Sequence, residues 1–326
     1  MKKSKVLKTI VFAGAAATAA AVYYQFNDLI GRKTPKKKTS HDVAEEKTES
    51  ERQKLWRESN EWLDERGSEM VSIQSHDGLQ LVGEFFEGDG NTEATVLLVH
   101  GYRSNRRSEY AAIAKFLLEA GYNILMVDDR AHGESEGKYV GFGCLDREDC
   151  YRWLQYLDKR FEGKQKLFLH GVSMGASTVL MASSMNLPST VKGIIGDCGF
   201  TVPMEEFLHV ANKRVQGLKN SFLLKAFMYL VSLTSKVIAG YGFNDCSAKA
   251  CVAKTKIPVF IIHGDQDDFV PTYMGKEIYE ACNAPKELWL AEGAAHAESY
   301  YVQREEYERR VLEFYGKCQI EVEDED

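Results

Sequence analysis

The residue best placed to do chemistry is a serine between two glycines, Ser173 in the pentapeptide GVSMG at 171–175. An apolar run precedes it, as expected of a buried strand, and small residues follow it. Glycines at the two outer positions leave room for a sharp turn from strand into helix, which would hold Ser173 exposed and strained. A nucleophile belongs in such a position, although an ordinary glycine-bearing turn has the same pattern.

A serine nucleophile needs a base, and the order of residues along the chain points to one histidine. A serine hydroxyl reacts poorly at neutral pH unless a histidine takes its proton and an acid orients that histidine. After such a turn the expected order is serine, acid, histidine. Seven of the eight histidines precede Asp265, and the last of these, His263, ends a buried strand and precedes every acid of its own loop. Only His296 follows both the turn and this loop, so we predict that it is the base.

The acid has several candidates. The segment HGDQDDFVP at 263–271 offers Asp265, Asp267 and Asp268, and Asp197 ends an earlier strand. An acid that supports the base must point inward and stay ionised. Asp265 directly follows a glycine and suits the turn, and Asp268 suits a helix cap. We therefore favour Asp267, with Asp197 as a further candidate.

Backbone amides are expected to complete the site. The oxyanion that forms when a serine attacks a carbonyl needs two N–H donors. Met174 follows the serine at the predicted start of a helix, where the helix dipole also favours negative charge. Tyr102 lies in the loop after the strand VLLVH, which we expect to supply the second donor.

Alternating strands and helices predict the frame that positions these residues. Strands that are apolar throughout and alternate with helices form parallel sheets covered by helices on both faces, so the predicted class is α/β. Ligands bind at the carboxyl ends of such strands, where Ser173 and His263 fall. A β-hairpin through Asp77-Gly78 opens the domain. The predicted strands are 70–75, 79–87, 94–100, 122–128, 166–172, 191–197, 257–265 and 286–292, and the predicted helices are 108–121, 146–161, a segment ending at 185, 272–282 and 298–315.

The alternation pauses between residues 201 and 256, which predicts a small helical cap inserted before the last strands. The cap carries an apolar run that suits an acyl chain or lipid, but the same side chains could simply pack the cap onto the domain. We place the catalytic domain at 69–318 and an acidic tail at 319–326.

The segment before this domain has a different composition. Residues 1–33 hold a basic head and then the apolar run Thr9 to Phe26, which predicts a single N-terminal membrane helix or a secretory signal that is cleaved. A soluble helix packed on the core is the least expected alternative, because no polar face is visible. The composition of residues 34–68 predicts a charged linker that continues into an amphipathic helix. The short basic head favours a catalytic domain outside the cytoplasm, whereas seven scattered cysteines oppose it.

Composition excludes some classes of function. The net charge of -7 argues against a general nucleic-acid-binding protein. The seven cysteines show neither a disulfide framework nor zinc-ligand spacing. We therefore expect no metal and no organic cofactor, and the sequence predicts no protein partner.

Four motifs together resemble the α/β-hydrolase superfamily, over about Met70 to Tyr315. They are HGYRSN at 100–105, DDRAHGESEG at 128–137, GVSMGAS at 171–177, and HGDQDDFVP with GAAHAES at 293–299. The chain is most similar to bacterial esterase, lysophospholipase-like and serine-aminopeptidase-like hydrolases with an N-terminal hydrophobic segment. The resemblance implies Ser173 as nucleophile, Asp267 as acid, His296 as base, and the amides of Tyr102 and Met174 as oxyanion donors.

These inferences predict a serine hydrolase that cleaves an ester or related acyl bond of a small or lipid-like substrate through an acyl-enzyme. One alternative is a serine peptidase acting on short peptides, because one fold hosts both chemistries. Another is a catalytically silent, membrane-tethered binding protein. His132, in DDRAHGESEG, is expected to brace the loop after VLLVH that carries Tyr102, here called the oxyanion loop, rather than to react.

Overall fold

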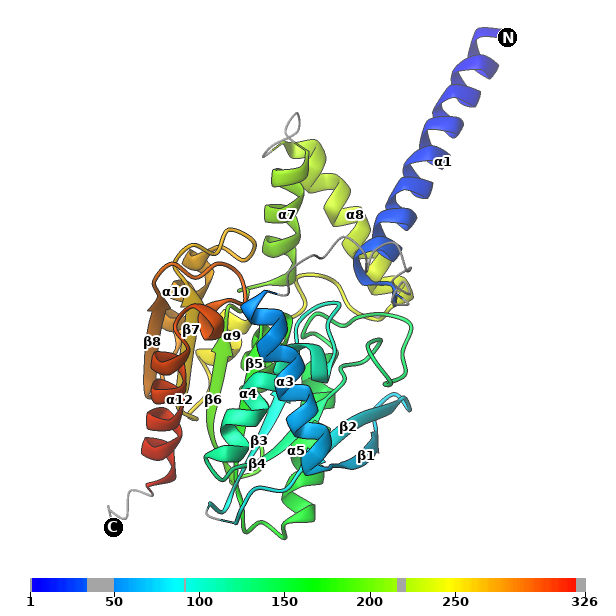
Figure 1. Ribbon diagram of the computed structural model, residues 1–326. Helices are drawn as coiled ribbons and strands as arrows, with labels where there is room; N and C mark the ends of the chain where they lie inside the picture. Colours follow the sequence, from blue (N-terminus) through cyan, green and yellow to red (C-terminus); the bar gives the residue numbers. More distant parts are fainter. Residues whose placement is uncertain (1, 34–49, 91, 216–220, 321–326) are drawn as a thin grey trace.

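The computed structural model describes residues 2–33, 50–90, 92–215 and 221–320, and its centre is an eight-stranded sheet (Figure 1). The strand order is β1-β2-β4-β3-β5-β6-β7-β8. Neighbouring strands from β4 to β8 are parallel, whereas β2 is antiparallel to both of its neighbours. The predicted α/β class with a mostly parallel sheet is therefore confirmed. The strands are β1 (Glu69–Gln74), β2 (Gln80–Phe86), β3 (Ala94–Val99), β4 (Asn123–Val127), β5 (Lys166–Val172), β6 (Val191–Asp197), β7 (Val259–Gly264) and β8 (Lys286–Ala291).

The helices follow the predicted alternation with one difference at the end of the chain. A single final helix was expected, but two helices form, because the backbone of Gln303 is not helical (φ −132°, ψ 57°). The predicted hairpin is present, with β1 and β2 paired around the turn at Gly78. The helices are α1 (Lys2–Ile30), α3 (Glu51–Arg66), α4 (Arg106–Glu119), α5 (Asp146–Arg160), α6 (Met174–Ala182), α7 (Pro203–Arg214), α8 (Phe222–Ile238), α9 (Ala248–Val252), α10 (Thr272–Ala281), α11 (Ser299–Val302) and α12 (Arg304–Gln319).

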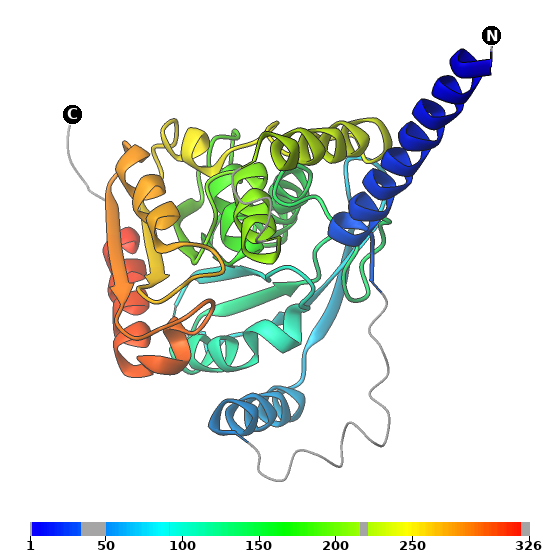
Figure 2. The same ribbon diagram turned by 90° about the horizontal axis from the view of Figure 1, so that it is seen from above.

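Two apolar cores lie on opposite faces of the sheet. Side chains alternate along a strand, so Val96 and Leu98 of β3 pack in one core, and Leu97 and Val99 pack in the other. Helices α3, α4 and α12 cover the first face, and α5, α6 and α10 cover the second (Figure 2). This double cover fixes the carboxyl ends of the parallel strands, where the site lies.

The C-terminal end of α1 packs into the domain, which differs from the expectation for the N-terminal segment. Val22, Phe26 and Ile30 are buried in the same core as α5 and α6. Their spacing of four residues places them on one face of the helix. This stripe was missed because alanines and other apolar residues surround it. In Figure 1 the rest of α1 projects away from the domain.

A membrane helix was predicted here. Within the described residues, no helix combines the length and the apolarity needed to cross a bilayer. Membrane association therefore stays a prediction.

The predicted amphipathic helix before the domain forms as α3. Its start is fixed by Ser50, whose side chain accepts from the amide of Gln53 while the Gln53 side chain accepts from the amide of Ser50. Leu63 of α3 is buried under α4. The first part of the predicted linker, 34–49, and the acidic tail from 321 lie outside the described residues.

The insertion between β6 and β7 is helical, as predicted. Helices α7 and α8 lie above the carboxyl edge of the sheet in Figure 1, and α9 leads back into β7. The start of α8 is capped by Ser221, whose hydroxyl accepts from the amide of Leu224. The cap therefore covers the edge at which Ser173, His263 and Asp197 emerge.

Candidate active site

Ser173 lies at the turn between β5 and α6, with φ 57° and ψ −115°. A non-glycine residue held at positive φ costs on the order of 1–3 kcal/mol. The two glycines allow this turn, because a Cβ on Gly175 would lie 1.9 Å from the carbonyl oxygen of Val99, and a Cβ on Gly171 would lie 2.2 Å from that of Gly175. The strained turn is thus present, but Ser173 is only 9% exposed, because it lines a cavity under the cap.

The structure brings the predicted nucleophile, base and acid together. Asp267 lies in the loop after β7, and His296 lies in the loop after β8. With the imidazole proton on Nδ1, Ser173 Oγ donates to His296 Nε2 at 2.8 Å. His296 Nδ1 then donates to Asp267 Oδ2 at 2.7 Å. In this arrangement His296 can take the serine proton while Asp267 stabilises the imidazolium that forms.

The surroundings of Asp267 keep it ionised. Burial alone would raise the pKa of Asp267, but hydrogen bonds from His263 and His296 outweigh burial and lower the pKa from 3.8 to about 2. The other carboxylate oxygen, Oδ1, accepts from the amides of Phe269 and Val270, both at 3.0 Å. These bonds also fix the direction in which the carboxylate points.

The three other candidate acids have different partners. Asp265 Oδ1 accepts from the amide of Gly293 at 2.7 Å, which closes a turn. Asp268 is exposed and pairs with Lys213 at 2.7 Å. Asp197 is buried, and burial raises its pKa to about 6. Its carbonyl oxygen accepts from the amide of Ser173 at 2.8 Å, so Asp197 holds the turn from the neighbouring strand.

His263 is a neighbour of the acid that sequence analysis did not assign. Its Nε2 lies 3.3 Å from Asp267 Oδ2 and 2.9 Å from the carbonyl oxygen of Val270. The side chain is fully buried. The order of His263 and the acids along the chain does not distinguish a histidine that contacts the acid from one that only ends a strand.

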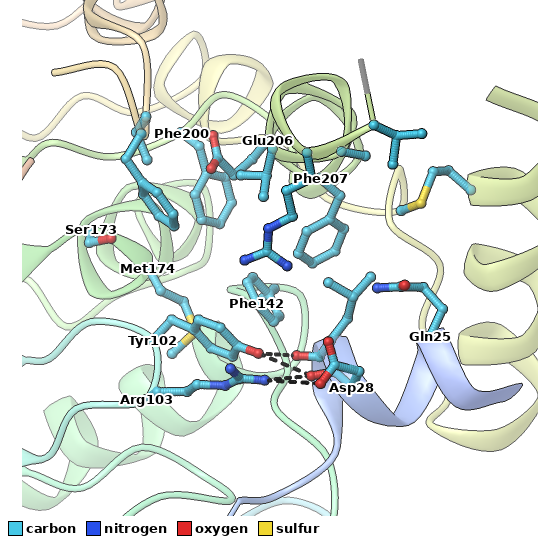
Figure 3. Close-up of a pocket in the computed structure, with 18 of the residues that line it drawn as sticks. Gln25, Asp28, Tyr102, Arg103, Phe142, Ser173, Met174, Phe200, Glu206 and Phe207 are labelled. Carbon is cyan, nitrogen blue, oxygen red and sulfur yellow. Dashed lines mark hydrogen bonds and ion pairs between the residues drawn. The ribbon is translucent and has the colours of Figure 1, made fainter. Parts of the chain in front are cut away.

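The two residues predicted as oxyanion donors both lie close to Ser173 (Figure 3). Met174 is the first residue of α6, and first-turn amides have no partner within their helix. Tyr102 lies in the loop after β3, which passes close to the serine: a Cβ on Gly101 would lie 3.3 Å from the Cβ of Ser173. His132 holds this loop, since its Nε2 accepts from the amide of Arg103 at 3.1 Å. The bracing contact expected of His132 is therefore present.

The end of α1 also holds the oxyanion loop. The hydroxyl of Tyr102 donates to the carbonyl oxygen of Leu29 at 2.5 Å, and the guanidinium of Arg103 donates to that of Asp28 at 2.6 Å. Just beyond α1, Arg32 donates to the carbonyl oxygen of Ser135 at 2.6 Å. The end of α1 and the residues just after it thus hydrogen-bond to both the oxyanion loop and the loop after β4. The composition of this segment did not indicate such a role.

A cavity of about 180 Å³ leads from Ser173 under the cap (Figure 3). Its walls come from the end of α1, the loops after β3, β4, β6 and β7, the turn at Ser173, and the cap helices α7 and α8. Most wall side chains are apolar, which suits an acyl chain. The residues drawn and labelled in Figure 3 are Gln25, Asp28, Tyr102, Arg103, Phe142, Ser173, Met174, Phe200, Glu206 and Phe207.

One acidic side chain stands among these apolar walls. Glu206 of α7 is 4% exposed, and neither carboxylate oxygen has a hydrogen-bond partner among the described residues. Burial and the nearby charge of Asp267 raise its pKa to about 8. Sequence analysis missed Glu206, because a glutamate in the first turn of a helix is ordinarily solvated and favourable to the helix dipole.

Among the described residues, two groups could place three ligand atoms around a metal ion: Cys198, Asp267 and His296, and a second group at His76, Asp77 and Asp149. Neither arrangement favours a metal. Burial raises the pKa of the Cys198 thiol well above its usual range, which opposes the thiolate that a metal needs.

In the second group, both carboxylates are already engaged. Asp77 and Asp149 each form hydrogen bonds with the guanidinium of Arg130.

Comparisons with known proteins show which families and folds this chain is similar to. The family model described as "Serine aminopeptidase, S33" matches residues 90–238. The uncharacterized protein YqkD of Bacillus subtilis is 27% identical over 281 residues, which cover 86% of this chain and 88% of that protein. A lysophosphatidylserine lipase of Danio rerio is 24% identical over 204 residues, which cover 61% of this chain but only 50% of the lipase.

Among solved structures, an esterase of Pyrococcus furiosus is similar, with a TM-score of 0.61 and 27% identity. The similarity covers 78% of this chain and 92% of the esterase. An esterase of Exiguobacterium antarcticum, at 18% identity and a TM-score of 0.56, shares the fold.

Proposed function

Because the chain belongs to the α/β-hydrolase superfamily, with esterases and a lipase among its relatives, we propose that it is a serine hydrolase that cleaves carboxylic esters. The observation that carries the proposal is the hydrogen-bonded chain from Ser173 through His296 to Asp267, with distances of 2.8 and 2.7 Å. A serine on a strained turn, beside a base held by an ionised acid, is the arrangement that nucleophilic acyl transfer needs.

The reaction follows from these contacts. Ser173 Oγ attacks the substrate carbonyl as its proton passes to His296 Nε2. The amides of Met174 and Tyr102 donate to the oxyanion that forms. The C–O bond to the leaving alcohol then breaks, and the alcohol takes the proton from His296. Water, deprotonated by the same base, cleaves the acyl-enzyme and restores the serine.

The cavity supports an ester with an apolar acyl chain as the substrate. Phe142, Phe200 and Phe207 line the space beside Ser173. Burial of apolar surface contributes about 25 cal/mol per Å², so each added methylene that fits the cavity strengthens binding. We therefore expect kcat/KM to rise with acyl length until the cavity is full.

A serine peptidase is the second candidate, favoured by the description of the matching family model. A panel of p-nitrophenyl esters of two to twelve carbons, measured beside aminoacyl p-nitroanilides, separates the two functions. We expect ester hydrolysis that Ser173→Ala abolishes and little anilide hydrolysis. Faster cleavage of the anilides would contradict the ester proposal in favour of a peptidase.

We further propose that the protein works at a membrane surface. Helix α8 contacts the cavity through Leu224 and Met228, whereas Phe222 and Val237 are 81% and 79% exposed. In Figure 1, α8 lies at the end of the molecule from which α1 projects. Exposed apolar patches of this kind mark interaction sites, and here the patch adjoins a cavity suited to an acyl chain. Its members are Phe222, Leu223, Tyr229, Leu230, Leu233, Val237 and Ile238.

A further inference from the structure

The buried carboxyl group of Glu206 has no role in the reaction described above. Its two oxygens lack hydrogen-bond partners among the residues that the structure describes, although the residue is only 4% exposed. Leaving a buried polar group unpaired destabilises a protein, and a charged one more so. Glu206 also lines the cavity that holds Ser173 (Figure 3). A ligand in the cavity is thus a partner that these oxygens can reach.

Glu206 lies on the side of the cavity that is nearer to the loop carrying Asp267. Glu206 shares one face of α7 with His209 and Lys213, which lie 2.9 and 2.8 Å from the carbonyl oxygen of Asp268. That carbonyl follows Asp267 in the loop after β7, and Asp267 lies behind His296. The leaving alcohol must take its proton from His296, so the alcohol part of an ester lies toward this side of the serine. The ligand group that meets Glu206 therefore belongs to the alcohol, whereas the apolar walls receive the acyl chain.

The chemistry of the carboxyl group indicates which ligand group fits. Burial holds Glu206 in its neutral form at neutral pH, since its pKa is raised to about 8. A neutral carboxyl group donates through its O–H and accepts through its other oxygen. A hydroxyl group both donates and accepts, so one hydroxyl can satisfy both atoms of Glu206. An ammonium group would instead need the ionised carboxylate.

We propose that Glu206 is a specificity-determining residue that hydrogen-bonds a second hydroxyl on the leaving alcohol, so that the enzyme prefers hydroxyalkyl esters to plain alkyl esters. The inference rests on the proposed ester hydrolysis. The ionisable groups around Glu206 do not offer it another partner. Lys213, on the same helix, pairs with Asp268, and Asp267 is held by two histidines. His209, also on α7, contacts the carbonyl oxygen of Asp268. Tyr273 of α10, whose pKa Glu206 helps to raise, and the cavity-wall residues Asp28, Arg103 and Arg214 form no hydrogen bond with Glu206 in the described part of the chain.

The test compares two matched substrates, 2-hydroxypropyl octanoate and propyl octanoate. We expect the wild type to favour the hydroxyl ester by on the order of tenfold in kcat/KM, the effect of one well-placed hydrogen bond. Glu206→Leu should bring the ratio to about one and raise Tm, because it removes an unpaired buried carboxyl. Glu206→Gln, which still donates and accepts, should keep part of the preference. Glu205→Gln, on the exposed side of the same helix, is the control and should leave the ratio unchanged.

The pH dependence gives a second measurement. The wild-type preference should change above about pH 8, as Glu206 loses its donor proton and can only accept, whereas the preference of Glu206→Gln should not change there. Hydrolysis of both esters with a ratio near one in the wild type, or a ratio that survives Glu206→Leu, would overturn the proposal. A preference for 2-aminopropyl esters that grows above pH 8 would overturn it in favour of a cation. Hydrolysis of neither ester would instead refute the proposed function itself.

Discussion

At the scale of single residues, the site depends on one ionised carboxylate. Asp267 is almost completely buried, yet two histidines and two backbone amides pair with its oxygens. The folded protein lowers the pKa of Asp267 from 3.8 to about 2. A shift of this size corresponds to about 2 to 3 kcal/mol of stability at neutral pH.

Asp267→Asn should therefore change both catalysis and stability. Loss of the acid should lower kcat by about 10³- to 10⁴-fold, because the imidazole is no longer held and stabilised. Since the folded pKa lies below the unfolded one, the stabilisation is present above about pH 4 and is lost as the pH falls toward 2. Urea unfolding should show that the difference in free energy of unfolding between wild type and variant becomes smaller as the pH falls from 7 to 3.

The control for this prediction is Asp268→Asn, in an exposed residue of the same loop. It should leave kcat and the pH profile of stability close to those of the wild type. If the difference in free energy of unfolding between wild type and Asp267→Asn stays constant over this pH range, the ionised carboxylate does not stabilise the folded protein.

The residues brought together at the site were largely predictable, and the reason is topological. Parallel strands end at one edge of a sheet, so the order of strands along the chain indicates that Ser173, Asp267 and His296 meet there. Glu206 could not be predicted, because only the packing of α7 over the cavity separates it from water. Its neighbour Glu205 has the same residue type and is exposed.

At the scale of elements, the C-terminal end of α1 packs into the α/β domain. Phe26 and Ile30 are fully buried, and the last turn of the helix accepts hydrogen bonds from Tyr102 and Arg103 of the oxyanion loop. The sequence predicted a hydrophobic helix here but not its contact with the loop, because contacts between segments more than 70 residues apart leave no local pattern. The position of the amide of Tyr102 thus depends on the N-terminal helix.

Tyr102→Phe tests this dependence while it keeps the backbone amide in place. The variant loses the hydrogen bond to Leu29, which is worth about 0.5–1.5 kcal/mol, so the oxyanion loop should be less well positioned. We expect kcat to fall by about two- to tenfold, with KM nearly unchanged, in steady-state hydrolysis of a p-nitrophenyl ester. Tyr24→Phe, at an exposed position of α1, is the matched control. An unchanged kcat in Tyr102→Phe would mean that α1 does not position the loop.

At the scale of the whole molecule, the cap, the cavity and the N-terminal helix lie at one end. The cap could be predicted from the pause in strand–helix alternation, and α7 and α8 form there. Whether its apolar run faced a substrate or the core could not be predicted, and α8 faces both the cavity and the outside. This arrangement would let an acyl chain pass from a bilayer into the cavity, and it makes membrane binding the property to measure.

Flotation with vesicles of phosphatidylcholine and phosphatidylglycerol tests the proposed membrane surface. We expect the wild type to float with the vesicles and the double variant Leu233→Ser, Val237→Ser to bind several-fold less, since both side chains are exposed on α8. Ile320→Ser, an exposed position beyond α12, should bind like the wild type. Equal flotation of the double variant and the wild type would exclude α8 from the membrane contact.

The most direct measurement is labelling with a fluorophosphonate probe, followed by peptide mapping of the wild type, Ser173→Ala and His296→Ala. The probe reacts only with a serine that a base activates. We expect one label per wild-type chain on Ser173, none on Ser173→Ala, and labelling of His296→Ala slowed by at least about a thousandfold. A folded wild type that takes no label, or a label that persists in Ser173→Ala, would show that Ser173 is not the nucleophile.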